Sequence, residues 1–117
     1  MTTVYIARRG PARSRSLQAL LEASRGIEVL GLADTLYRAQ AALPGADPDA
    51  LMIDLQLEDG AALSLVRSLR DLQTERPRVM LMATDAADPL PFSTLRAGAD
   101  AYLLEADLPT AASLLRR

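Results

Sequence analysis

The chain has 117 residues, the length of one domain, and its 13 basic and 15 acidic residues give a net charge of −2. It contains no Cys, His, Trp or Lys, so every basic side chain is Arg. These absences exclude disulfides, thiolate nucleophiles, imidazole metal sites, Ser-His-Asp triads and lysine contacts to phosphate, and the balanced charge gives no global reason to expect nucleic-acid binding.

The first half of the chain alternates short apolar runs with longer helical patterns. Residues 4–7 are typical of a buried strand, and the spacing of leucines predicts a helix over 12–24. Residues 27–32 form a second predicted strand. Asp34 is the predicted N-cap of the next helix, which we expect to end at Pro44 and Gly45.

The second half of the chain continues this alternation. A third strand is predicted over residues 50–53 and is closed by Asp54, and a helix is expected to start at Asp59 and Gly60. The remaining predicted elements are a strand over 79–82, a helix near 92–97 shortened by Pro89 and Pro91, a strand over 101–104 and a last helix opened by Pro109.

Five strands that alternate with five helices indicate an α/β fold, a doubly wound three-layer sandwich with a five-stranded parallel sheet. In such a sheet, ligands bind at the carboxyl ends of the strands. Those ends carry Arg8, Arg9, Asp54, Ala83 and Glu105. The sequence therefore directs attention to these side chains.

The apolar runs are too short to span a bilayer, and the N-terminus lacks the pattern of a signal peptide. We therefore expect a cytoplasmic protein without membrane contact. The last predicted helix has only about two turns, so we expect residues 1–117 to be one domain cut from a longer protein.

Three stretches of the chain carry a family pattern. Residues 7–11 read Ala-Arg-Arg-Gly-Pro and are followed by Leu-Leu-Glu at 20–22, which together are similar to the pattern A-D-D-H-P…L-L-E. Residues 48–55 are similar to the pattern P-D-[VL]-[VL]-[LM]-[LI]-D-[LI]. Residues 96–105 are similar to R-A-G-A-D-G-Y-L-L-K. Over nearly its whole length, the sequence resembles the receiver domain of bacterial two-component response regulators. The closest likeness is to receivers that precede a LuxR-type helix-turn-helix.

The resemblance implies a flavodoxin-like, CheY-like fold with strand order 2-1-3-4-5. It makes Asp54 the equivalent of the phosphoacceptor and Tyr102 the equivalent of the switch aromatic. It also implies a magnesium site, built from two acidic residues after the first strand.

The pocket departs from the family at almost every other position. Arg8 and Arg9 replace the acidic pair, and Glu105 replaces the Lys after the last strand. Ala83 stands where the family has Ser or Thr, with Thr84 one position further on. Since guanidinium groups repel cations, we expect no Mg²⁺ and no other cofactor.

The charges of the pocket are inverted rather than lost. This pattern favours a salt-bridge cluster in which Arg8 or Arg9 pairs with Asp54 and Glu105; the alternative is that both arginines point to solvent. Arg13 and Arg15 extend the run of basic residues, which is typical of a solvated helix face and less often of an anion site.

We consider three functions. The first is a non-enzymatic pseudo-receiver, a phosphorylation-independent interaction or dimerisation module in transcription regulation; the second is a receiver phosphorylated on Asp54 by a cognate histidine kinase. The third is a flavodoxin-like domain that binds a small anion. Family likeness places the partner or homodimer face on helix four, strand five and helix five, with Leu95, Tyr102 and Leu104. DNA contact is expected only through a missing output domain.

Overall fold

The computed structural model describes residues 1–72, 76–83 and 90–116. Within them, one sheet contains the parallel strands β1 (Thr2–Ala7), β2 (Ile27–Ala33), β3 (Ala50–Asp54), β6 (Arg78–Ala83) and β7 (Ala101–Leu104). Their order is β2-β1-β3-β6-β7. Since β6 and β7 are the fourth and fifth strands of this sheet along the chain, the order is 2-1-3-4-5, and the predicted doubly wound sheet is confirmed.

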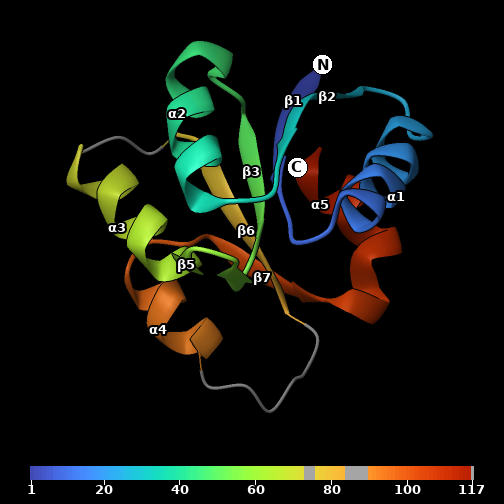
Figure 1. Ribbon diagram of the computed structural model, residues 1–117. Helices are drawn as coiled ribbons and strands as arrows, with labels where there is room; N and C mark the ends of the chain where they lie inside the picture. The colour runs from blue at the N-terminus through green and yellow to red at the C-terminus, as the bar shows by residue number, and fades with distance from the viewer. Residues whose placement is uncertain (73–75, 84–89, 117) are drawn as a thin grey trace.

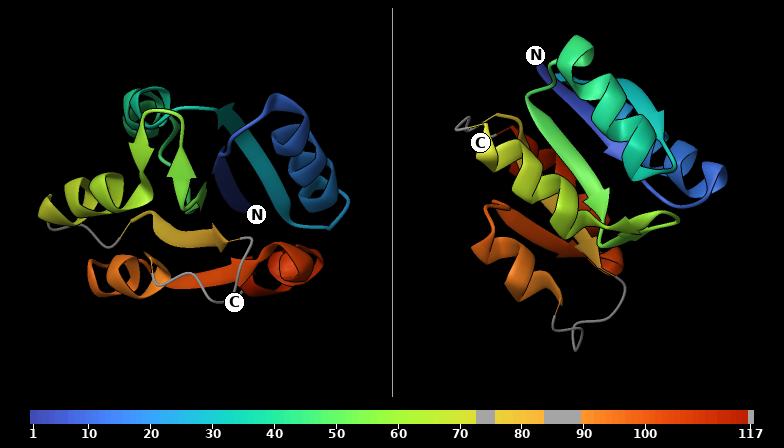
Figure 2. Two further views of the ribbon diagram at one scale, coloured as in Figure 1. Left: turned by 60° about the horizontal axis from the view of Figure 1, so that its bottom comes forward. Right: turned by 60° about the vertical axis from the view of Figure 1, so that its left-hand side comes forward.

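Helices cover both faces of the sheet (Figures 1 and 2). One face carries α1 (Pro11–Glu22) and α5 (Ala111–Leu115), and the other carries α2 (Leu36–Ala46), α3 (Ala62–Asp71) and α4 (Leu90–Arg96). A 3₁₀ helix, η1 (Glu105–Thr110), joins β7 to α5. In the part of the chain that the structure describes, none of these helices is long and apolar enough to cross a bilayer.

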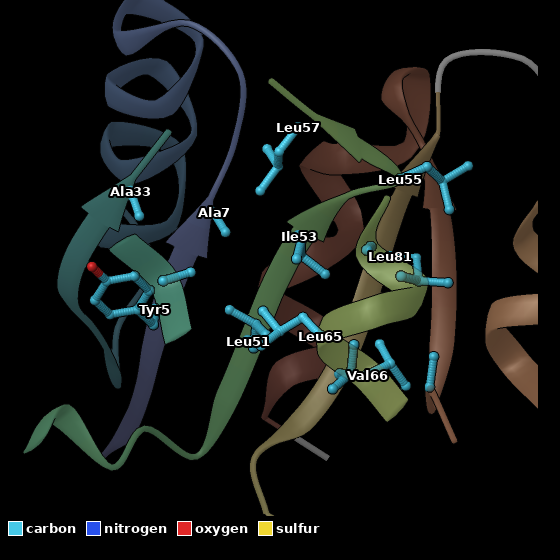
Figure 3. Close-up of a cluster of buried hydrophobic side chains, with 14 of the residues drawn as sticks. Tyr5, Ala7, Ala33, Leu51, Ile53, Leu55, Leu57, Leu65, Val66 and Leu81 are labelled. Atoms are coloured by element: carbon cyan, nitrogen blue, oxygen red, sulfur yellow. The ribbon is translucent and has the colours of Figure 1, made fainter. Parts of the chain in front are cut away.

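The sheet separates two apolar cores, because alternate side chains of a strand point to opposite faces. Tyr5, Leu51, Ile53 and Leu81 pack toward α2 and α3 in the core that Figure 3 shows. The opposite core lies toward α1 and α5 and takes up the intervening strand residues, which are Val4, Ile6, Met52, Met80 and Met82. The three strand methionines thus fill one core only.

The start and end of α2 differ from the prediction. Thr35, not Asp34, is the N-cap: its hydroxyl accepts a hydrogen bond from the Arg38 N–H at 3.1 Å, while Asp34 pairs with the Arg38 guanidinium at 3.3 Å. The helix passes through Pro44 and ends at Ala46. A proline near the end of a helix loses a single backbone hydrogen bond and keeps a helical φ, so it did not terminate α2.

A short hairpin replaces the predicted helix start at Asp59 and Gly60. Its strands are β4 (Gln56–Leu57) and β5 (Gly60–Ala61), and α3 begins only at Ala62. The Asp59 carboxylate caps a different helix, because it accepts the N–H groups of Leu36 at 2.7 Å and Tyr37 at 3.0 Å. Asp59 therefore stabilises the N-terminus of α2.

The C-terminal third agrees with the prediction except at the start of α4 and at the last helix. The strand predicted over 101–104 is confirmed. Pro109 lies inside η1 instead of opening the last helix, and α5 starts at Ala111. Glu105 and Asp107 already start a helical turn ahead of Pro109, so the segment begins earlier. Helix α4 begins at Leu90 and includes Pro91, so the prediction that Pro91 shortens this helix is wrong. The N–H groups of a helix's first turn have no partner within the helix, so a proline there breaks no helical hydrogen bond. Pro89 falls outside the described residues.

Candidate functional site

The side chains singled out in the sequence gather at the carboxyl edge of the sheet. Arg8 directly follows β1, Asp54 is the last residue of β3, Ala83 is the last residue of β6, and Glu105 directly follows β7. These strands are neighbours in the order β1-β3-β6-β7. Parallel strands bring these four positions to one edge, where doubly wound folds bind their ligands.

Arg8 is buried within this edge and is only 2% exposed. Its guanidinium donates hydrogen bonds to both carboxylate oxygens of Glu105, and its Nε lies 3.5 Å from Oδ1 of Asp54. The distance and geometry to Asp54 are those of an ion pair without a hydrogen bond, and the buried Nε has no hydrogen-bond partner among the residues that the structure describes. Arg8 thus bridges the ends of β3 and β7.

Arg9 has the opposite environment. Its side chain is exposed, and its backbone N–H donates a hydrogen bond to Oδ2 of Asp54 at 2.9 Å. Of the two arginines considered for the salt-bridge cluster, the structure brings Arg8 together with Asp54 and Glu105. Arg9 contributes its peptide group instead.

Arg13 is a member of the cluster that the sequence interpretation missed. Its guanidinium lies 3.6 Å from Oδ2 of Asp54 and 3.4 Å from Oε2 of Glu105, and it donates to the carbonyl of Arg9 at 3.4 Å. The signal was the spacing, because Arg13 lies four positions after Arg9 in the first turn of the helix that starts at the site. Both carboxylates therefore face two guanidinium groups.

The two carboxyl groups differ in acidity. Burial raises the pKa of Asp54, and the Arg9 N–H and the charges of Arg8 and Arg13 only partly oppose this rise. Burial also acts to raise the pKa of Glu105, but the hydrogen bond and charge of Arg8, together with Arg13, outweigh it and bring this pKa below its usual value. Glu105, whose side chain is 41% exposed, is thus the better solvated partner of Arg8.

A small cavity of about 160 Å³ opens beside Asp54. Ala83 lines it with no polar group, and Arg9, Arg13 and Gln56 line it with donors. Thr84, one position beyond Ala83, lies outside the described residues. Tyr102 is half-buried in β7 and packs against the core under α2 and α3.

The donors at this edge do not fit Mg²⁺. Magnesium prefers oxygen ligands in octahedral geometry, and here the oxygens of both carboxylates face arginine. Across residues 1–72, 76–83 and 90–116, no group of three or more acidic, His or Cys side chains is placed to hold a metal ion.

The motif at residues 96–105 has a structural explanation beside its family pattern. Gly98 has a φ of +122°, and a Cβ there would lie 2.5 Å from Cγ of Arg70. Arg70 donates to the Gly98 carbonyl at 2.9 Å and pairs with Asp100 at 3.1 Å, and Asp100 also accepts the N–H of Val79 at 2.7 Å. These residues position β7 against β6 and α3.

Comparison with known proteins gives similarity in sequence and in fold. No protein-family model matches the chain. It is 29% identical over 107 residues to the DNA-binding transcriptional activator DevR/DosR of Mycobacterium tuberculosis, which covers 90% of this chain and 48% of that protein. It is 33% identical over 103 residues to the KDP operon transcriptional regulatory protein KdpE of Escherichia coli, covering 88% of this chain and 44% of that protein. The chain therefore spans about half the length of these relatives.

Solved structures share the whole fold. A DNA-binding response regulator of the LuxR family from Staphylococcus aureus superposes with a TM-score of 0.87, covers all of both chains and is 16% identical in sequence. Response regulator and receiver domains from other bacteria superpose equally well. The fold is the CheY-like receiver fold.

Proposed function

We propose that this chain is a response-regulator receiver domain that works without phosphorylation, as a non-enzymatic protein-interaction or dimerisation module. One observation carries the proposal: the buried Arg8 guanidinium bridges Asp54 and Glu105. The receiver fold and the likeness to response regulators over about nine-tenths of the chain supply the family context.

The cluster opposes phosphoryl transfer in two ways. A phosphoryl group in transfer carries negative charge that a metal ion normally offsets, and the carboxylates that could bind such an ion are engaged by arginine. In addition, Glu105 places a second negative charge near Asp54, where the family has a cation. The arginines stabilise the carboxylates in their ground state instead.

The proposed interaction face is formed by α4, β7 and α5. Leu95, Tyr102 and Leu104 are half-buried and pack against the core, so they support this face from beneath. Phe92 on α4 is 60% exposed and is the large apolar side chain that this face offers to a partner. The partner is a second copy or another protein, and a regulatory role in transcription through a further DNA-binding domain follows the relatives that the chain matches.

Intact mass spectrometry after incubation with acetyl phosphate and Mg²⁺ tests the phosphorylation part. We expect an unchanged mass, and amide NMR spectra that do not respond to beryllofluoride. A species heavier by about 80 Da that disappears in Asp54→Ala would establish the alternative, a phosphorylated receiver. Saturable shifts around Asp54 with millimolar Mg²⁺ would contradict the absence of a metal site.

Sedimentation tests the interaction face. If copies of the chain associate through it, Phe92→Asp lowers the dimer fraction at a given concentration. Tyr37→Asp is the matched control, because Tyr37 lies on α2 and is 79% exposed. An equal effect of both substitutions would remove α4 from the interface.

A further inference from the structure

The cavity beside Asp54 is lined by hydrogen-bond donors, two of which are positively charged, and by one carboxylate. The cavity has a volume of about 160 Å³ and is lined by Arg9 from the turn before α1, Arg13 from the first turn of α1, Gln56 from β4 and Asp54 from β3. It lies at the carboxyl edge of the sheet, next to the N-terminus of α1. A phosphate-sized molecule fits this volume.

The charges around the cavity do not cancel. Arg8 and Arg13 balance Asp54 and Glu105, which leaves the charge of Arg9 in excess. The Arg9 side chain is exposed and forms no ion pair within the described part of the chain, while its backbone is fixed by the hydrogen bond to Asp54. The site therefore retains one positive charge that an anion can neutralise.

Arg13 is also free to turn toward a ligand. Each of its contacts, with Arg9, Asp54 and Glu105, is 3.4 Å or longer, so it gives up little when it rotates. The twelve-residue helix α1 adds to the positive potential, because none of the described side chains caps its N-terminus and no acidic residue lies in its first turn.

Asp54 determines which anion fits. A carboxylate in the wall repels an oxyanion that has no proton, but it accepts a hydrogen bond from the P–OH group of hydrogen phosphate. Among the described residues, Oδ2 of Asp54 accepts one hydrogen bond, from the Arg9 N–H, and Oδ1 accepts none, so the carboxylate keeps lone pairs that can accept a further hydrogen bond.

We propose that this cavity reversibly binds a protonated phosphate group, held by the guanidiniums of Arg9 and Arg13 and by the Gln56 amide, with its P–OH donating to Asp54. No bond to Asp54 forms, so the inference is separate from the question of phosphorylation. The group is inorganic phosphate or the phosphate of a small monoester.

Titration of the ¹⁵N-labelled protein with inorganic phosphate, at ionic strength held constant with NaCl, tests the proposal. We expect saturable amide shifts at Arg9, Arg13 and Gln56, reversal on dialysis and an unchanged intact mass. Arg9→Gln should raise the dissociation constant about tenfold or more. Arg15→Gln is the matched control, because it removes a charge equal to that of Arg9 and Arg15 does not line this cavity.

Sulfate separates specific binding from charge alone. At neutral pH it has no proton to donate, so we expect it to bind about tenfold more weakly than phosphate, and Asp54→Asn should abolish this preference. Methyl phosphate in place of inorganic phosphate distinguishes the two sources of the ligand. Absence of saturation, equal weakening by Arg15→Gln, or sulfate binding as tight as phosphate binding would overturn the proposal.

Discussion

Arg8 and Arg9 are neighbours in the sequence, yet one is buried against two carboxylates and the other reaches solvent. The chain turns between β1 and α1 at Gly10, whose φ is +83°, and this turn directs the two side chains apart. Both arginines could be placed at the sheet edge from the sequence. Which of them faces the pocket depends on the turn, which strand alternation alone does not specify.

At Arg8 we expect a large loss of stability on truncation. Arg8→Ala removes the buried cation beside Asp54 and leaves Arg13, which is equally near but 43% exposed. Deletion of one partner of a buried pair costs about 3 kcal/mol or more. Arg9→Ala should change the free energy of unfolding by about 0.5 kcal/mol or less. Urea denaturation at pH 7 measures both, and similar losses for the two variants would contradict the assigned roles.

A double-mutant cycle isolates the coupling between Arg8 and Asp54. Asp54→Asn keeps an acceptor for the Arg9 N–H and removes the charge that Arg8 leaves behind, so it should recover part of the loss in the Arg8→Ala background. Additivity within about 0.5 kcal/mol would show that the two groups are not coupled.

Glu105 gives the site a dependence on acid. Its pKa is lower in the fold than in the unfolded chain, so its contribution to stability is present above about pH 4.3 and is lost as the pH falls through the folded pKa. Asp54 has the opposite sign, because its raised pKa favours the folded state as it takes up a proton. We expect Glu105→Gln to lose less stability than wild type between pH 5 and pH 3, about the range of carboxyl titration. We would measure the free energy of unfolding of both proteins by denaturation at each pH. An equal loss for the two proteins over this range would contradict the prediction.

A long-range contact helps to define the start of α2. Asp59 caps α2 from the β4–β5 hairpin, 23 positions away from Leu36. Local signals predicted that α2 exists but chose Asp34 in place of the adjacent Thr35, whose own bond to the Arg38 N–H is local. The contact from Asp59 was missed and Asp59 was given to α3, because capping rules compare residues a few positions apart. The sheet strands and the helices that flank them followed from apolar periodicity, whereas the β4–β5 hairpin and its contact with the start of α2 did not.

The turn before β7 allows a matched test with two glycines. Gly98→Ala should destabilise the protein by about 2 kcal/mol, because alanine would have to adopt the positive φ of this position and its Cβ would collide with the Arg70 side chain. Gly45→Ala should stabilise it by about 0.5 kcal/mol, because Gly45 is helical and no atom lies within 4 Å of its added Cβ. Thermal unfolding of both variants checks the contrast, and a neutral Gly98→Ala would show that Arg70 can move aside.

Across the whole molecule, the scaffold and the site carry separate information. Buried strands such as Ala50–Asp54 and the spacing of the helices suffice to predict a parallel sheet with helices on both faces. The strand order came from the resemblance to receiver domains. The chemistry of the edge depends on a few side chains, and their replacement leaves a fold that still superposes on a response regulator with a TM-score of 0.87. The sequence identified Asp54, Arg8 and Glu105, whereas Arg13 emerged only with the helix in place.

This separation predicts that the edge can be converted. Arg8→Asp with Arg9→Asp and Glu105→Lys places carboxylates where the arginines are, and we expect it to gain saturable Mg²⁺ binding at millimolar concentration by NMR. Arg8→Asn with Arg9→Asn and Glu105→Gln is the neutral control and should bind none. If the acidic variant folds but does not bind Mg²⁺, residues beyond these three positions also exclude the metal.

The methionines on one side of the sheet can serve as NMR probes of that side. Met52, Met80 and Met82 lie in the core under α1 and α5, and Met82 also lines the cavity beside Asp54. Methyl-labelled methionine would therefore report on this one layer from three buried positions, with Met82 as the reporter nearest to a bound ligand. A signal that moves at Met82 while Met52 stays still would locate an event at the sheet edge without any engineered probe.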